Sequence, residues 1–373
     1  MCGRSCGILC EVVFPVRRAS NSPTCGGEKG SASPLKWVRV FAAHLRELSP
    51  FIIRRVFYSV GVVALVSVLV FLLVSLSGDP LSNLRQNPRI ARSDIARIEH
   101  RMGLDQPTYV QFGYWLRDTV RGEGEWANSF SHRAPVLPII WDRFKNTLVL
   151  MTATVFVCLL VAIPLGIFSA LRQYSKLDYT VTALSFFGLS MPVFWFGLIL
   201  QLVLGYYVMQ WFHLREPLFY TASMYTTGME GDVLNRLRHL VLPVLTLSLA
   251  TIAGWSRYQR SSMLDVLNQD YLRTARAKGL PERSVIYKHA LKNALIPVVT
   301  VVAVDLAYLL GGAVVTETIF AWPGMGRLFV QALEQRDFPM VMGAVIFTSA
   351  ILVSFSLFAD IVYGFLDPRI RQE

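Results

Sequence analysis

The sequence predicts an all-α membrane protein with six transmembrane helices, a polar helical loop on the cytoplasmic side and a small external domain between the first two helices. Of the 373 residues, 53% are hydrophobic and only 16% are charged, whereas soluble domains are about 45–50% apolar and about 25% charged. Six apolar segments have lengths near the ~20 residues that a helix needs to cross a bilayer. The lysines and arginines of the short loops fall on one side of these spans, as membrane insertion favours.

Residues 1–50 precede the first span and contain Gly, Ser, Pro and Arg without a sustained hydrophobic period. This composition predicts a disordered cytoplasmic extension, with a short amphipathic piece at 37–48 on the membrane surface. The stretch lacks the apolar run of a signal peptide. Most of the cysteines lie here without a neighbouring histidine or a paired Cys-x-x-Cys motif, so we expect no metal site from Cys2, Cys6, Cys10 and Cys25.

The first predicted transmembrane helix occupies residues 51–77, with its apolar stretch at 56–76. An external insert follows at 78–146, in which 93–99 predicts a helix capped by Ser93 and 107–117 predicts a second helix. The remaining core, 147–370, carries five spans and a polar loop at 264–296. We place the five spans at 147–171, 181–211, 240–255, 295–316 and 341–365.

The basic residues of the short loops set the orientation. Arg172 and Lys176 lie between spans two and three, and Arg369 and Arg371 follow span six. A larger basic group lies between spans four and five and consists of Arg273, Arg276, Lys278, Arg283, Lys288 and Lys292. All three regions fall on one side of a six-span chain, so we expect both termini in the cytoplasm.

The polar loop at 264–296 predicts two short helices with a tight break between them. Leu264, Leu267, Tyr271 and Ala275 recur with helical spacing on one face. Gly279 is placed as the left-handed residue that ends the first helix, and Pro281 fits the first turn of the second. The second helix has an apolar face formed by Val285, Ile286, Ala290 and Ala294. Spacing alone leaves open whether the apolar stripe packs on its own bundle or on a partner.

Several longer motifs resemble one family. The strongest are Tyr271-Leu-Arg-Thr-Ala-Arg-Ala-Lys-Gly279, His289-Ala-Leu-Lys-Asn-Ala294 and Gly311-Gly-Ala-Val-Val-Thr-Glu-Thr-Ile-Phe-Ala-Trp-Pro-Gly-Met-Gly326, with Gly103-Leu-Asp-Gln-Pro107 and Leu366-Asp-Pro-Arg369 in support. Over roughly residues 50–370 the chain resembles the inner-membrane permease subunit of a bacterial ATP-binding-cassette importer, in the dipeptide, oligopeptide and nickel branch.

In such importers the segment before the fifth span is a coupling segment that docks into a groove of the ATPase. The family pattern is Glu-Ala-Ala, then Gly, then a later Leu-Pro. Here Arg273 and Thr274 replace the glutamate and first alanine, Ala275 and Gly279 match, and Leu291-Lys292 replaces Leu-Pro. The resemblance implies that small residues allow close approach and that charged ones orient the partner. The implied coupling residues are Arg273, Ala275, Arg276, Lys278, Gly279, Leu280 and Glu282.

The resemblance also implies a set of partners and a mechanism. The partners are two cytoplasmic ATP-binding subunits, a second related permease subunit, an extracytoplasmic substrate-binding protein and the lipid of a bacterial inner membrane. The expected cargo is a dipeptide or oligopeptide moved by alternating access. Nickel, glutathione or another small solute is an alternative cargo for the same importer type, and a stand-alone secondary transporter is the rival from another class.

Motifs for chemistry on a substrate are missing from the sequence. It contains no P-loop, no Gly-x-Ser-x-Gly and no His-Glu-x-x-His, so we expect no catalytic residue, no metal site, no cofactor and no ATPase site of its own. The formal net charge of +11 is explained by loop residues that set membrane orientation, so we expect no nucleic-acid partner.

Asp305 lies inside the fifth span, where a carboxylate is costly and usually faces a cavity or a partner. It is a candidate for the translocation path, where it would meet a substrate amine or a metal, and the alternative is a buried structural pair or a protonated carboxyl. Glu317 and Asp360 lie nearer the ends of their spans, where we expect water to satisfy them.

Overall fold

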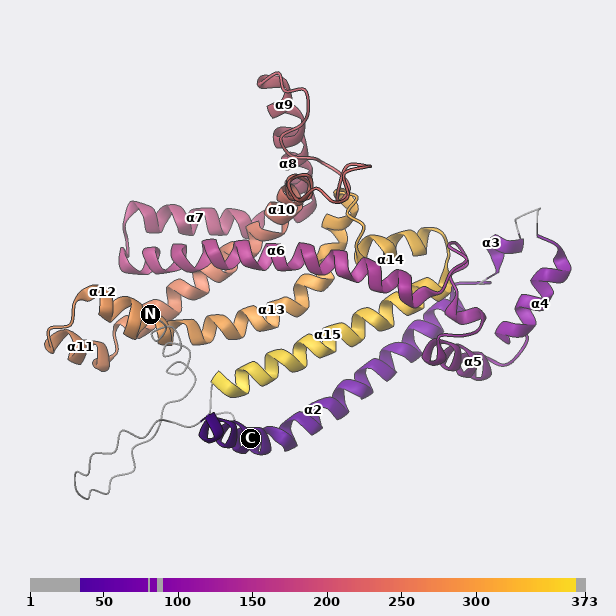
Figure 1. Cartoon of the computed structure of the whole chain (residues 1–373), viewed down its shortest axis with the longest axis horizontal. Coiled ribbons are helices and arrows are strands. Elements are labelled where there is room, and N and C mark those ends of the chain that lie inside the picture. Colours follow the sequence, from indigo (N-terminus) through magenta and orange to yellow (C-terminus); the bar gives the residue numbers. More distant parts are fainter. Residues whose placement is uncertain (1–33, 80, 86–89, 367–373) are drawn as a thin grey trace.

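The computed structural model describes residues 34–79, 81–85 and 90–366, and these residues form helices and loops without a β-strand. The long helices lie side by side along the long axis of the molecule (Figure 1). Six helices of the described chain are long and apolar enough to cross a membrane, as the sequence predicts. They are Ile53–Leu76, Val136–Leu171, Val193–Trp211, Val233–Leu267, Glu282–Leu306 and Phe338–Ile361.

The first helix, α2, extends over Pro34–Leu76 and is longer than the predicted span. Residues 34–50, which the sequence assigns to a disordered extension, are therefore helical and continuous with the membrane segment. Residues 1–33, with their four cysteines, lie outside the described residues.

The insert at 78–146, which the sequence predicts to be external, contains α3 (Ser82–Arg85), α4 (Arg92–Met102), α5 (Thr108–Arg121) and the short 3-10 helix η1 (Glu125–Ala127). The two larger helices confirm the predicted pair, although Ala91 and not Ser93 occupies the N-cap position of α4. The insert shares a core with α2, because the Phe71 ring packs against Trp115 and Trp126 with centroids 5.6 and 6.3 Å away. In the residues that the structure describes, the insert thus shares one hydrophobic cluster with α2 and with Met342 of the last helix.

The second span begins before its predicted start, because α6 runs over Val136–Leu171. The third predicted span, 181–211, is broken. It consists of α7 (Lys176–Ser190), α8 (Val193–Leu200), the π-helical η2 (Gln201–Tyr207) and α9 (Val208–Trp211). Pro192 disfavours a helical conformation at the residue before it, and Met191 is extended at φ −79° and ψ 122°. Figure 1 shows α8 and α9 turning away from the direction of α6 and α7.

The second half of the chain supplies the centre of the bundle. Helix α10 (Val233–Leu267) packs against α6 and α13 (Leu291–Ile319), and α13 packs against α15 (Phe338–Leu366). The loop between α13 and α15 contains a further helix, α14 (Met325–Glu334), that the sequence does not predict. Two short helices, α11 (Asp270–Ala277) and α12 (Glu282–Ser284), project at the end of the bundle opposite α3, α4 and α5 (Figure 1).

The expectation that water satisfies Glu317 is wrong. Its side chain is fully buried and accepts hydrogen bonds from Thr147 Oγ1 at 2.7 Å, Gly326 N at 2.7 Å and Arg327 N at 3.1 Å. Because its donors come from α6 and from the start of α14, Glu317 fixes the C-terminal end of α13 to both helices. Asp360 is also paired, with Arg55 of α2 at 3.3 Å.

Candidate coupling segment and membrane carboxylate

The predicted coupling loop begins with α11 (Asp270–Ala277), which is separated from α10 by a break at residues 268–269. Gly279 adopts a left-handed conformation with φ +74°, which confirms its predicted conformation. The Gly279 N–H donates to Arg276 O at 2.9 Å, and the Leu280 N–H donates to Ala275 O at 3.3 Å. This pair of bonds is the Schellman arrangement that closes a helix C-terminus, so the break between the two helices has a defined shape.

The second half of the loop starts after Pro281, which occupies the N-cap position of α12 (Glu282–Ser284). Helix α12 continues through the π-helical η3 (Val285–Ala290) directly into α13. Val285, Ala290 and Ala294 are fully buried, so the predicted apolar face of this helix is confirmed. The coupling loop is thus joined to the fifth span by continuous helix.

The inner face of α11 packs on the bundle itself. Leu272 is fully buried and Ala275 is 9% exposed, in a cluster with Met263 and Val285. Tyr271 is 41% exposed, and its hydroxyl accepts a hydrogen bond from Asn293 Nδ2 at 2.8 Å. The methyl group of Ala275 therefore holds α11 against its own protein, and the small residue that α11 presents outward is the exposed Ala277.

The outer face is exposed and rich in basic residues. Arg276 forms two hydrogen bonds with Glu282 across the break, at 2.9 and 3.2 Å, and Arg273 lies 3.5 Å from Asp270. The exposed residues from α11 to the start of α12 include Arg273, Arg276, Lys278, Gly279, Leu280 and Glu282. Every predicted coupling residue except Ala275 is thus exposed in the structure.

A buried ion pair that sequence reasoning missed lies close to this segment. Asp178, at the start of α7, accepts hydrogen bonds from Arg260 Nε at 2.7 Å, Arg260 Nη2 at 2.9 Å, Tyr174 N at 3.0 Å and the Ser169 hydroxyl. The hydrogen bonds from Arg260 hold the pKa of the Asp178 carboxyl well below its usual range. The pair joins the turn between α6 and α7 to α10. Because Arg260 and Asp178 are 82 residues apart, no local pattern could have revealed it.

The predicted membrane carboxylate lies away from the coupling surface. Asp305 is the central residue of the 29-residue α13 and accepts a hydrogen bond from Trp255 Nε1 at 2.7 Å. Trp255, on α10, is 1% exposed, whereas the Asp305 side chain is only partly buried. Its neighbour Val304 is 46% exposed, so this part of α13 lies at the surface of the chain.

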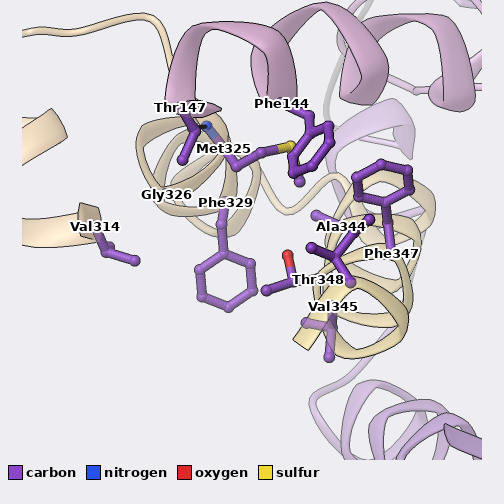
Figure 2. Close-up of a pocket in the computed structure, with 11 residues that line it drawn as sticks. Phe144, Thr147, Val314, Met325, Gly326, Phe329, Ala344, Val345, Phe347 and Thr348 are labelled. Carbon is purple, nitrogen blue, oxygen red and sulfur yellow. Dashed lines mark hydrogen bonds between the residues drawn. The ribbon is translucent and has the colours of Figure 1, made fainter. Parts of the chain in front are cut away.

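A cavity of about 210 Å³ lies between α6, α13, α14 and α15. Figure 2 shows the rings of Phe144, Phe329 and Phe347 around it, and Thr147 and Gly326 connect it to the Glu317 hydrogen bonds. The described residues that line it include no charged side chain, so it is an apolar space. Within the described residues, no group of three or more His, Cys, Asp or Glu side chains is placed to hold a metal ion.

Two family models match the chain. Residues 162–372 match the model described as the binding-protein-dependent transport system inner membrane component. Residues 48–151 match the model for the N-terminal region of the membrane component of the same transport systems. Together the two matches include the insert at 78–146, the polar loop at 264–296 and five of the six membrane-spanning helices in full, and they leave only residues 152–161 of α6 unmatched.

Curated relatives match over most of their length. The oligopeptide transport system permease protein AppB of Bacillus subtilis (strain 168) is 42% identical over 326 residues, which cover 87% of this chain and 100% of the relative. The dipeptide transport system permease protein DppB of Escherichia coli (strain K12) is 34% identical over 337 residues, with 87% and 99% covered. The chain therefore belongs to the family of binding-protein-dependent transport system inner membrane components, as a permease of the ATP-binding-cassette importer type that its motifs predict.

Proposed function

We propose that this chain is a transmembrane permease subunit of an ATP-driven importer of dipeptides or oligopeptides. The similarity to relatives named as oligopeptide and dipeptide permeases supports this cargo class. The subunit would move its cargo by alternating access and perform no chemistry on it. ATP would be hydrolysed by partner subunits, since the sequence contains no P-loop.

The observation that carries the proposal is the shape of the segment between α10 and α13. Its inner face is packed on the bundle by Leu272, Val285 and Ala290, and its outer face is exposed and basic. A rigid projecting helix pair of this kind can transmit the rigid-body movement of a docked partner to the spans that it joins. Arg273, Arg276, Lys278, Gly279, Leu280 and Glu282 would contact an ATP-binding subunit, and Ala275 would hold α11 in place.

The same proposal assigns the partners and the orientation. Two ATP-binding subunits would dock on the cytoplasmic side, a second related permease would complete the pore, and a substrate-binding protein would deliver cargo from outside. In Figure 1 the start of α2 and the end of α15 lie toward the end that carries α11 and α12, opposite the external insert. This arrangement, together with the basic loops, supports cytoplasmic termini and an external position for the insert. Asp305 would lie on the translocation path.

Two alternatives make different predictions. An importer of the same type that carries nickel, glutathione or another small solute would need the same partners and would differ only in cargo. A stand-alone secondary transporter would need ionisable groups near the membrane midplane for ion coupling. Asp305 is one such group, but the alternative gives no role to the exposed coupling surface.

The test is purification of the tagged full-length protein in a mild detergent, mass spectrometry of the bound proteins, and uptake of labelled peptides after reconstitution in vesicles. We expect two ATP-binding subunits and a second six-span permease to be retained, and uptake to require ATP and the binding protein. Purification of the chain alone, with solute uptake that needs no ATP, would favour the secondary transporter. Uptake of nickel or glutathione in preference to peptides would keep the importer and change its cargo.

A further inference from the structure

Three acidic residues of the spanning helices differ in how their charge is satisfied. Glu317 is buried with three hydrogen-bond donors, and Asp360 forms an ion pair with Arg55. Asp305 receives a single hydrogen bond, from the neutral indole of Trp255. Among the described residues, no cationic group lies within 4.0 Å of the Asp305 carboxylate.

This arrangement is costly at the position that Asp305 occupies. Asp305 is the central residue of α13 and lies within the predicted span 295–316, where a carboxylate without a cationic partner is disfavoured. A purely structural role would be expected to give it further donors, as Glu317 has. Trp255 donates to only one carboxylate oxygen, and the side chain remains partly exposed beside Val304. The other oxygen is therefore available to a group from outside the described chain.

We propose that Asp305 is a binding residue for the cationic amino group of the cargo and that Trp255 is its positioning residue. This inference rests on the proposed function and names the part of the peptide that the site recognises. Every peptide with a free N-terminus carries one ammonium group whatever its side chains are, so a single carboxylate can serve cargo of variable sequence. The indole N–H fixes one carboxylate oxygen and thereby sets the direction in which the other accepts a charge-assisted hydrogen bond.

A double-mutant cycle tests the assignment. Transport by the reconstituted complex is measured with a peptide and its N-acetylated form, each with wild-type protein and with Asp305→Asn. We expect the variant to lower kcat/KM for the free-amine peptide at least about tenfold, the effect of losing one hydrogen bond to a charged group. For the N-acetylated peptide, kcat/KM should differ little between the Asp305→Asn variant and the wild-type protein. Since the same binding protein delivers each peptide to both permeases, its preference cancels in the cycle.

Two further variants test the roles of the two residues. Asp305→Glu keeps the charge and should recover most of the transport that Asp305→Asn loses. Trp255→Phe keeps an aromatic ring but removes the donor, and should raise KM several-fold with a smaller change in kcat. The double variant Trp255→Phe with Asp305→Asn should be no worse than Asp305→Asn alone, because a positioning residue has nothing left to position. Additive losses would show that Trp255 acts independently of Asp305 and would overturn its role.

A labelling measurement gives a result even when the acetylated peptide is transported too slowly to follow. The complex is treated with a hydrophobic carbodiimide, with and without the peptide-loaded binding protein and a non-hydrolysable ATP analogue, and adducts are quantified by mass spectrometry. We expect the free-amine peptide to lower the adduct at Asp305 several-fold and to leave the adduct at Asp360, which has its own partner, unchanged. Equal labelling of Asp305 with and without peptide would overturn the proposal.

The outcomes also show whether the cation that binds Asp305 comes from the cargo or from the second permease. Protection of Asp305 in the complete complex without peptide would assign the partner to a lysine or arginine of the second permease and would overturn the cargo assignment. If the complex transports peptides but Asp305→Asn transports them as the wild type does, only this inference fails. If no ATP-driven peptide transport is found at all, the proposed function fails first.

Discussion

The guanidinium group of Arg276 donates two hydrogen bonds to the carboxylate of Glu282, at 2.9 and 3.2 Å, across the left-handed turn at Gly279. The two residues belong to different helices, α11 and α12. The planar fork of arginine restricts the relative orientation of the two helices more than a single hydrogen bond would. The ion pair and the Schellman turn together define how α11 is oriented relative to α12.

We expect Glu282→Gln to uncouple ATP hydrolysis from transport with little loss of stability. The two side chains are 40% and 57% exposed, and exposed ion pairs contribute at most about 1 kcal/mol. Without the negative charge of Glu282, however, the angle between α11 and α12 is less restricted. The measurement is the number of ATP molecules hydrolysed per peptide transported, which should rise in the variant.

Lys145→Gln is the matched control, because it breaks an exposed 2.9 Å ion pair with Asp142 near the other end of the bundle. It should leave the ATP-to-peptide ratio unchanged. Exchanging the charges in the double variant Arg276→Glu with Glu282→Arg should recover part of the coupling. A normal ratio in Glu282→Gln would show that the ion pair is not needed for transmission.

Gly279→Ala should destabilise the protein by about 1 kcal/mol, because a residue with a Cβ pays roughly that amount in the left-handed conformation. No atom lies within 4 Å of the site of the added Cβ, so the cost comes from the backbone alone. Gly254→Ala is the control: Gly254 lies in helix α10 with equal free space, and the change should be neutral or stabilising by up to about 1 kcal/mol. Thermal unfolding in detergent compares the two, and equal shifts would contradict the backbone explanation.

Ala275→Leu should lower the stability of the protein, whereas Ala277→Leu should weaken docking of the ATP-binding subunits. Ala275 is packed against Leu272 and Met263, so a larger side chain there should cost about 1–3 kcal/mol through overpacking. Ala277 is exposed, and its variant should change stability by less than about 0.5 kcal/mol yet weaken retention of the ATP-binding subunits. If Ala277→Leu retains those subunits as well as the wild type does, the outer face of α11 is not the docking surface.

Asp178→Asn should destabilise the protein by about 3 kcal/mol or more, because it leaves Arg260 without its carboxylate partner in a largely buried site. The pKa of Asp178 is lowered in the folded protein by the hydrogen bonds from Arg260. The contribution of the Asp178–Arg260 pair to the free energy of unfolding should therefore be complete above about pH 4, the pKa of an unfolded aspartate. It should decline as the pH falls further.

Thermal unfolding of wild type and variant from pH 8 to pH 3 measures this dependence. The difference in stability between the wild type and Asp178→Asn should be constant from pH 8 to pH 5 and should become smaller below about pH 4. A difference that shrinks already between pH 7 and pH 6 would contradict the assignment to a carboxyl of lowered pKa.

The parts of the fold that the sequence predicts are those set by local patterns. Six apolar stretches are long enough to span a bilayer, and Gly279 ends a helix because glycine tolerates the left-handed conformation at φ +74°. The apolar face of 285–294 follows from helical periodicity, and the structure buries Val285, Ala290 and Ala294. For these features the residues that decide the structure are neighbours in sequence.

The features that the sequence did not predict depend on distant partners. Glu317 is buried because Thr147, 170 residues away, and the start of α14 supply donors to it. Leu272 and not Tyr271 packs with Leu264 and Ala275, because the helix is interrupted at 268–269 and a spacing counted through that break does not hold in α11. Pro192 was visible in the sequence, but proline inside a span can also be accommodated by neighbouring helices, so the break at Met191 could not be foreseen.

Photo-crosslinking from two positions tests the central claim most directly. A photoreactive amino acid replaces Ala277, on the outer face of the coupling segment, or Tyr109, which is 78% exposed on the external insert. In the assembled complex we predict that position 277 crosslinks to an ATP-binding subunit and that position 109 does not. Crosslinking of the ATP-binding subunit from position 109, with none from position 277, would contradict both the orientation of the chain and the role of its coupling segment.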